Sequence, residues 1–282
     1  MPDIEKESIN FKKMMHDSFV DISKEIKYNP PAISIGTNIY KGNVYDTPFG
    51  SYGDFSCIVG ASKSRKTFFK SVLIACYIGG KSQNYFEDIK GHETENKLVI
   101  DIDTEQSKFH SQRVFKRVCE MVGTTPKQYK THSLRKYSPV ERFEFIEYLI
   151  YESEYKDKIG LISIDGFVDL CTDFNDLESS MKLVNKLMKW TEEKQIHITG
   201  ILHANPNTDK PKGHLGSRIL EKAETVAFVT KEDECSKVTC NYSRNIPFDE
   251  FYFKINKNDW LPYKTNKIDD WDLYSLNNNK KN

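Results

Sequence analysis

The chain has 282 residues, of which 38% are hydrophobic and 29% charged, and its 41 basic and 41 acidic side chains give a formal net charge of zero. This length predicts one large domain or two small ones with a buried core. The balanced charge excludes a global positive field that would attract nucleic acid, so any contact with DNA must be local, on a loop or on a surface shared by subunits.

No apolar run is long enough to cross a membrane, and the first ten residues are polar and of mixed charge. We therefore expect a cytoplasmic protein with neither a transmembrane helix nor a secretory signal. The six cysteines are dispersed without a Cys-x2-Cys spacing, which favours free thiols, several of them buried, over a zinc site or disulfides.

Residues 1–29 form a separate N-terminal extension in the predicted organisation. They mix charges with scattered apolar positions, a pattern typical of one or two amphipathic helices. Such helices either cover the following domain, which we favour, or face a neighbouring molecule. The prolines at 30 and 31 mark the boundary of the main domain, residues 30–264, and the polar, asparagine-rich residues 265–282 predict a flexible tail.

The main domain opens with short β-like pieces over 32–54, a predicted hairpin, and then reaches a motif typical of phosphate-binding loops. The apolar run 55–59 predicts a strand, residues 60–67 a loop, and residues 68–78 a helix. Backbone N–H groups at such a helix N-terminus bind phosphates, Lys66 supplies a cation to the β and γ positions, and the Thr67 hydroxyl ligates Mg²⁺. The candidate nucleotide-binding residues are Gly60, Ala61, Ser62, Lys63, Ser64, Arg65, Lys66, Thr67 and Phe68.

One position departs from the motif Gly-x4-Gly-Lys-[Ser/Thr], because Arg65 stands where the second glycine belongs. The octapeptide alone is therefore a weak signal, and a surface turn before a basic helix start is the alternative. Arg65 either alters the loop geometry and turnover or adds a phosphate contact of its own.

Strands and helices alternate through the rest of the chain and predict an α/β fold with a mainly parallel twisted sheet, helices on both faces and an antiparallel C-terminal extension. The predicted strands cover residues 97–103, 132–135, 160–165, 196–202, 224–230, 237–242 and 251–255, and the predicted helices cover 107–122, 140–149 and 176–193, the last with Asp176 as N-cap.

Three side chains at predicted strand ends complete a nucleotide site, since the carboxyl ends of parallel strands share one edge of the sheet. Asp165 has the form of a Walker B carboxylate that holds Mg²⁺ through water, and Glu105 is placed to polarise the attacking water. His203 is placed to contact the γ-phosphate. The alternatives are a turn or cap role for Asp165, a buried structural role for His203, and, for Glu105, either a solvated role or replacement as the base by Asp101 or Asp103.

The arrangement resembles the RecA-like P-loop ATPases, in particular the RepA, DnaB and RadA-type, helicase-like branch. The resemblance is carried by residues 60–67, 100–105, 161–166, 201–205, 215–217 and 242–245, and it spans most of the chain, from about 30 to 257. It implies ATP with Mg²⁺, catalytic roles for Lys66 and for Glu105 as base, and homo-oligomers such as hexameric rings with active sites between subunits. It also implies that Arg244 acts as an arginine finger on the neighbour's ATP, although Tyr242 stands where the family usually has a lysine. An ordinary surface arginine is the alternative for Arg244.

The polar loop over 205–214 matches the position where RecA-like proteins hold DNA. Lys210, Lys212 and Arg218 can each contact a phosphate there, and a ring would multiply these contacts. An ordinary solvated loop is the alternative, because four acidic residues follow Asp165 and would repel DNA in the same channel: Asp169, Asp173, Asp176 and Glu178.

These features predict a Mg²⁺-dependent ATPase that acts on DNA as a helicase, loader, or replication or mobilisation factor. The alternative is a nucleotide-binding adaptor that assembles with partners and turns over slowly or not at all, which Arg65, Tyr242 and the zero net charge support. A small-molecule kinase would need an acceptor site, and the sequence shows none.

Overall fold

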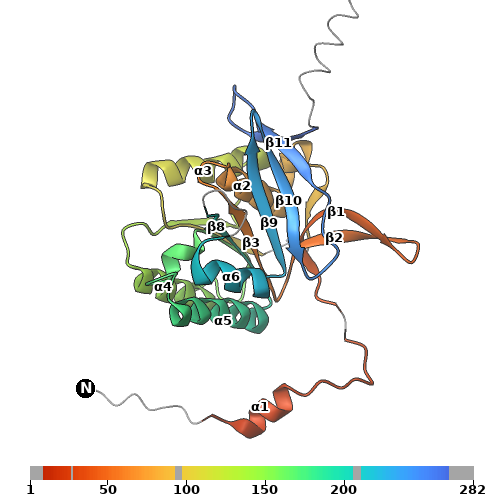
Figure 1. The fold of residues 1–282 in the computed structure, drawn as a ribbon, viewed down its shortest axis with the longest axis vertical. Helices are drawn as coiled ribbons and strands as arrows, with labels where there is room; N and C mark the ends of the chain where they lie inside the picture. Colours follow the sequence, from red (N-terminus) through yellow and green to blue (C-terminus); the bar gives the residue numbers. More distant parts are fainter. Residues whose placement is uncertain (1–8, 27, 93–96, 206–210, 267–282) are drawn as a thin grey trace, which may run out of the picture.

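A nine-stranded sheet organises the chain in the computed structural model, which describes residues 9–26, 28–92, 97–205 and 211–266 (Figure 1). The strands are β3 (Phe55–Gly60), β5 (Leu98–Asp103), β6 (Tyr129–Ser133), β7 (Ile159–Asp165), β8 (His197–His203), β9 (Thr225–Glu232), β10 (Cys235–Ser243), β11 (Phe251–Ile255) and β12 (Pro262–Thr265). Their order across the sheet is β12-β11-β10-β9-β3-β8-β7-β5-β6.

The strands from β9 to β6 in this order run parallel to one another, whereas β10, β11 and β12 are joined antiparallel at one side. Every residue of β3 and β7 is buried, as expected for parallel strands that are covered on both faces. The predicted α/β fold, with its mainly parallel sheet and antiparallel extension, is confirmed. The strand predicted at 132–135 lies earlier, at β6, and β12 was not predicted.

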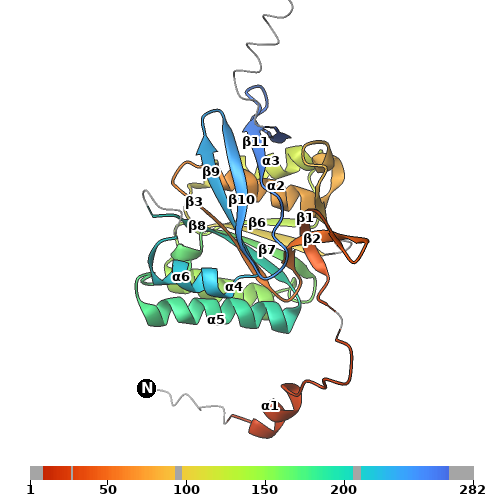
Figure 2. The ribbon, with the colours of Figure 1, turned by 45° about the vertical axis from the view of Figure 1, so that its right-hand side comes forward.

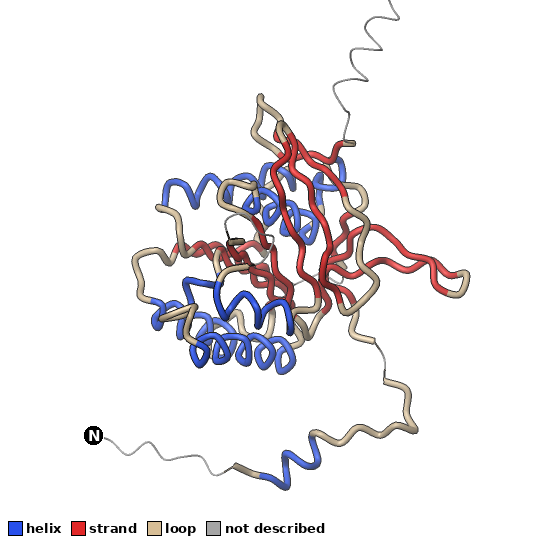
Figure 3. Tube along the Cα trace, viewed as in Figure 1, coloured by secondary structure: helices blue, strands red, loops and turns tan. Residues whose placement is uncertain are grey.

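Helices cover both faces of the sheet (Figure 3). Helices α2 (Lys66–Ile78) and α3 (Lys108–Val122) pack in one hydrophobic cluster, and α4 (Pro139–Tyr151), α5 (Leu177–Lys194) and α6 (Gly213–Lys222) pack in the other. Asp176 caps α5 as predicted, since its side chain accepts a hydrogen bond from the Ser179 N–H. Ser138 and Glu141 form a reciprocal capping box at the start of α4.

A small second sheet lies beside the large one and has the order β2-β1-β4. The hairpin predicted over 32–54 corresponds to β1 (Pro31–Tyr40) and β2 (Asn43–Ser51). Between the helix predicted at 68–78 and the strand predicted at 97–103, where the sequence indicated neither helix nor strand, the structure has the 3-10 helix η1 (Gly80–Asn84) and β4 (Ile89–Gly91), which pairs antiparallel with β1. A strand of three residues is too short to show an alternating pattern.

The N-terminal extension does not cover the domain in the described residues. Helix α1 (Phe11–Asp17) has no buried residue, and Figures 1 and 2 show it separated from the sheet and its covering helices. Phe11 is 70% and Ile22 98% exposed, so the expectation of a covering helix was wrong. In the predicted tail, Thr265 ends β12 and Asn266 is described, while residues 267–282 lie outside the described residues.

All six cysteines are free thiols, and Cys57, Cys76, Cys171 and Cys235 are buried. Among the residues that the structure describes, no group of acidic, histidine and cysteine side chains has the form of a metal cluster. In the same residues, no helix is both long and apolar enough to cross a bilayer.

Candidate nucleotide-binding site

The parallel register places the predicted site residues along one edge of the sheet. Gly60 at the end of β3 is level with His203 at the end of β8, and Asp103 at the end of β5 is level with Asp165 at the end of β7. The crevice outside the carboxyl ends of such strands is where α/β sheets bind ligands. Glycine is required at position 60, because a Cβ there would lie 2.4 Å from the Val229 carbonyl oxygen and 2.6 Å from Ser64 Oγ.

Lys66 is held at the centre of the loop. Its Nζ donates to the carbonyl oxygens of Gly60 at 2.8 Å and Ala61 at 2.7 Å, and the residue is 5% exposed. Burial lowers the pKa of Lys66 to about 8, while Asp165 and Glu105 oppose this shift. The adjacent Ser64 Oγ is buried without a hydrogen-bond partner in the described residues. Such a loop offers an ammonium and unpaired polar groups to an anion.

Arg65 takes the backbone conformation that the missing glycine would take, with φ 74° and ψ 23°. This left-handed conformation costs a residue with a side chain about 1–2 kcal/mol. The guanidinium donates to the Glu234 carbonyl oxygen at 2.9 Å, in the turn between β9 and β10. A phosphate contact of Arg65 stays a prediction. Phe68 contributes its backbone to the first turn of α2, and the Arg117 guanidinium lies 3.6 Å from the centre of its ring.

The Thr67 hydroxyl donates to Asp165 Oδ2 at 3.1 Å, so the two residues expected to serve the metal lie together. Asp165 is almost fully buried, and burial raises its pKa, while Lys70 and the Thr67 hydroxyl oppose that shift. A buried carboxylate beside a hydroxyl suits Mg²⁺, which prefers hard oxygen ligands and usually keeps several waters. These residues therefore fit the expected ion.

Three acidic side chains lie in or directly after β5, namely Asp101, Asp103 and Glu105, and they have separate roles. Asp103 Oδ1 accepts hydrogen bonds from the backbone N–H groups of Glu105 at 3.0 Å and Gln106 at 2.8 Å, and so fixes the turn that carries Glu105. Glu105 is 59% exposed, and its Oε2 lies 3.7 Å from His203 Nε2. The His203 ring lowers the pKa of Glu105, so this carboxylate is ionised at neutral pH and is the member of the three that can reach a water.

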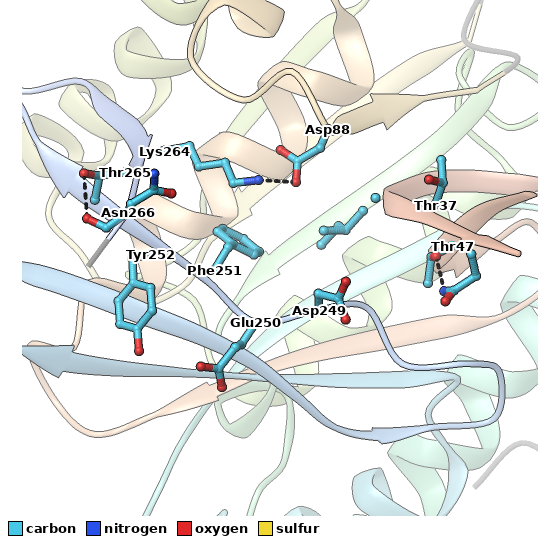
Figure 4. Close-up of a pocket in the computed structure, with 13 residues that line it drawn as sticks. Thr37, Thr47, Asp88, Asp249, Glu250, Phe251, Tyr252, Lys264, Thr265 and Asn266 are labelled. Carbon is cyan, nitrogen blue, oxygen red and sulfur yellow. Dashed lines mark hydrogen bonds and ion pairs between the residues drawn. The ribbon is translucent and has the colours of Figure 1, made fainter. Parts of the chain in front are cut away.

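A cavity of about 380 Å³ opens directly at the loop and is lined by residues 60–64, by Ala204 and Asn205, and by residues 228–231. A second cavity of about 380 Å³ lies away from it, where β1 meets β11 and β12 (Figure 4). Its lining includes Asp88, Asp249 and Glu250, and Lys264 forms an ion pair with Asp88 at 2.6 Å. An excess of carboxylates repels phosphates, so the cavity at the loop is the better candidate for a nucleotide.

Comparison with known proteins gives a match in structure. No family model and no curated protein sequence matches the chain. Among solved structures, the RadB recombinase resembles it with a TM-score of 0.52 and 15% sequence identity, over 77% of this chain and 92% of the RadB chain. The chain has a RecA-like fold. At this identity the similarity establishes the fold alone.

Arg244 lies at the opposite end of the RecA-like sheet from the phosphate loop. Its Nη1 is 2.7 Å from Oδ2 of Asp54, which directly precedes β3, and its Nη2 donates to the Lys222 carbonyl oxygen. Within one chain, the structure therefore does not bring Arg244 together with Lys66 and Glu105. Its role as an arginine finger needs a second copy and stays a prediction.

The candidate DNA loop of the RecA-like core is described in part. Lys210 lies outside the described residues, Lys212 precedes α6, and Arg218 is paired with Glu221 at 2.8 Å. Three of the opposing acidic residues have internal partners: Thr104 Oγ1 donates to Asp169 Oδ2 at 2.7 Å, the Asn175 N–H donates to Asp173 Oδ1 at 2.8 Å, and Asp176 caps α5. These hydrogen bonds fix the carboxylates but leave their charges in place, and Asp169 also has a cationic neighbour, Arg142 Nη1, at 3.9 Å.

A buried ionic cluster beside the site was missed by sequence reasoning. Lys70 on α2 and Asp101 on β5 are completely buried, and Lys70 Nζ lies 3.0 Å from Asp101 Oδ1. The sequence signal was present, since a lysine inside an otherwise apolar helix and an aspartate inside an apolar strand each need a partner when buried.

Proposed function

We propose that this chain binds ATP with Mg²⁺ at the loop of residues 60–67, hydrolyses it, and acts on DNA as a helicase, loader, or replication or mobilisation factor. The observation that supports this best is the convergence of Lys66, His203 and Glu105 with the Thr67–Asp165 pair at one edge of a RecA-like sheet. RadB, one of the solved structures that share this fold, is a recombinase, which favours work on DNA.

Each residue has a chemical role in this proposal. The loop N–H groups and Lys66 bind the phosphates, and Thr67 and Asp165 would hold Mg²⁺, which neutralises charge on the transferring phosphoryl group. Glu105 accepts the proton of the attacking water. His203 Nδ1 lies 3.4 Å from Lys66 Nζ while its Nε2 faces Glu105, so the ring links the phosphate-binding cation to the base and can respond to loss of the γ-phosphate.

We further propose that the protein works as a homo-oligomer, such as a ring. Arg244 can reach an ATP only on a neighbouring copy. Two described segments also expose apolar side chains that a monomer does not cover: the N-terminal extension and the tip of the β1–β2 hairpin, which projects from the body of the molecule (Figure 1). Exposed apolar surface of this kind marks interaction sites. The exposed residues are Ile9, Phe11, Met14, Met15, Phe19, Val20, Ile22, Ile26, Ile39, Tyr40, Val44 and Tyr45.

The deciding experiment is steady-state ATP hydrolysis by the wild type and Lys66→Ala, with and without single-stranded DNA and over a series of salt concentrations. We expect DNA to stimulate turnover less as salt increases, because phosphate contacts release counterions. Lys66→Ala should lose ATP binding, whereas Lys116→Ala, which removes an exposed lysine of α3, should not. Turnover that DNA leaves unchanged at every salt concentration would contradict the role on DNA.

The second candidate is a nucleotide-gated adaptor with little or no turnover. The observation that favours it is Arg65, whose backbone replaces the motif's glycine and whose side chain links the loop to the β9–β10 turn. Through this hydrogen bond, binding of a nucleotide at the loop can shift the β9–β10 turn, and a partner that contacts the turn would detect the change. ATP binding that Lys66→Ala abolishes, together with no hydrolysis in any variant and no response to DNA, would support the adaptor and exclude the motor.

A further inference from the structure

Lys70 places a permanent positive charge beside the carboxylate expected to serve the metal. It lies on α2 one turn after Lys66, its side chain is completely buried, and its Nζ is 3.0 Å from Asp101 Oδ1 and 3.7 Å from Asp165 Oδ2. A buried charge is normally paired with opposite charge, and Asp101 and Asp165 both lie within 4.0 Å of this ammonium. The ammonium is therefore charged, and its charge is divided between Asp101 and Asp165.

Asp101 lies closer to the ammonium than Asp165 does, at 3.0 Å against 3.7 Å, and so keeps the larger share of that charge. Its second oxygen, Oδ2, accepts a hydrogen bond from the Tyr129 hydroxyl at 2.6 Å, so both carboxylate oxygens have a donor. Asp101 lies on β5 and Asp165 on β7, which are neighbouring parallel strands. The carboxylates thus face the ammonium from two fixed positions of the sheet, and a shift of the ammonium toward one moves it away from the other.

Asp165 Oδ2 is shared between donors. The same oxygen that lies 3.7 Å from Lys70 also accepts the Thr67 hydroxyl at 3.1 Å. A cation held through Asp165 therefore shares this carboxylate with an ammonium that repels it. Because both side chains are almost completely buried, this repulsion is screened less than it would be at the surface.

We propose that Lys70 is a positioning residue that orients Asp165 toward Thr67 and weakens the hold of Asp165 on the divalent cation that accompanies ATP, and that Asp101 counteracts this by drawing the charge of Lys70 to itself. This inference rests on the proposed function, since the cation is the Mg²⁺ of the nucleotide. It predicts that two substitutions in the same cluster change the Mg²⁺ requirement in opposite directions.

The first variant is Asp101→Asn, which keeps an acceptor for Tyr129 but leaves the charge of Lys70 to Asp165 alone. The second is Lys70→Met combined with Asp101→Asn, which removes both charges of the inner pair and leaves Asp165 free of the ammonium. Tyr129→Phe is the control, because it removes the hydrogen bond to Asp101 and changes no charge at neutral pH.

The measurement is the Mg²⁺ concentration that gives half of the metal-dependent binding of a fluorescent ATP analogue to the full chain, which requires no hydrolysis. We expect it to rise at least threefold in Asp101→Asn, to fall at least threefold in the double variant, and to stay within twofold of wild type in Tyr129→Phe. Thermal unfolding checks that each variant folds, and Lys70→Met with Asp101→Leu removes the same charges should the first double variant fail to fold.

Two results would overturn the inference, and they are distinguishable. If both charge variants raise the Mg²⁺ requirement, the cluster serves stability alone and Lys70 does not oppose the metal. If the wild type binds the analogue equally with Mg²⁺ and with EDTA, the proposed metal role of Thr67 and Asp165 fails first, and the inference about Lys70 fails with it.

Discussion

Oε2 of Glu105 lies 3.7 Å from Nε2 of His203, and the neighbouring Asp103 holds the turn that places it there. Glu105 is the exposed one of the three acidic side chains in its segment, because Asp101 and Asp103 are buried. A base must reach a water and must be ionised at the working pH, and Glu105 meets both conditions.

We therefore expect Glu105→Gln to lower kcat for ATP hydrolysis by about 100-fold or more, since general-base catalysis contributes about 10²–10⁴-fold. ATP affinity should stay within about twofold, because phosphate binding depends on the loop and Lys66. The measurements are single-turnover hydrolysis and equilibrium binding of ATP. Glu87→Gln changes an exposed glutamate before β4 in the same way and should leave both unchanged. A Glu105→Gln variant with wild-type kcat would remove Glu105 from the chemistry.

Arg65 offers a test of loop geometry that needs no activity. At φ 74° glycine avoids the steric cost that any side chain bears, so Arg65→Gly should be more stable to denaturant than Arg65→Ala by about 1 kcal/mol. Both variants lose the hydrogen bond to the Glu234 carbonyl oxygen, so the difference between them reports the backbone alone. Lys116 is solvent-exposed and lies in the middle of α3, so there the order of stability should reverse. Lys116→Gly should be less stable than Lys116→Ala by about 1 kcal/mol. Equal stability of the two Arg65 variants would contradict the left-handed conformation.

Much of the RecA-like core was predictable because its signals are local. An apolar strand, a glycine, Lys66-Thr67 and an apolar helix follow one another in sequence, and Asp165 and His203 end apolar runs. The parallel register then brings Gly60 level with His203 and Asp103 level with Asp165 without further information. Strand ends on one edge follow from the fold class.

What the sequence did not predict depends on contacts between distant segments. The partners of Lys70 come from β5 and β7, and β4 is recognisable only by its pairing with β1. The apolar pattern of the N-terminal extension predicted a helix, but periodicity does not show which surface an apolar face meets. In the structure α1 meets none of the domain.

The uncovered extension predicts concentration-dependent self-association. Phe11 is 70% and Met15 74% exposed, and they lie one helical turn apart on α1. We expect Phe11→Ser with Met15→Ser to lower the weight-average mass measured by light scattering at micromolar protein, because the variant removes apolar area from the predicted interface. Lys12→Ser with Lys13→Ser, on the same helix, should change the mass less. An unchanged mass in the apolar variant would show that α1 does not join copies of the chain.

The arginine-finger prediction for Arg244 can be tested separately from a purely structural role. Its ion-pair partner within the same chain, Asp54, can be changed without removing Arg244. The ion pair with Asp54, at 2.7 Å, is lost in both Arg244→Ala and Asp54→Asn, but only the first removes the guanidinium. If Arg244 completes a neighbour's site, Arg244→Ala should lower kcat by about 10³-fold or more, as loss of an arginine finger does elsewhere. Asp54→Asn should keep most of the activity.

Mixing experiments strengthen this test. Lys66→Ala subunits bind no ATP but still carry Arg244, so adding them to Arg244→Ala subunits should restore hydrolysis at the shared interfaces. Restored turnover in the mixture, measured against each variant alone, requires that one copy supply the guanidinium to another. Equal losses of kcat in Arg244→Ala and Asp54→Asn, with no recovery on mixing, would instead assign Arg244 to the stability of its own chain, where it ties the start of β3 to the end of α6.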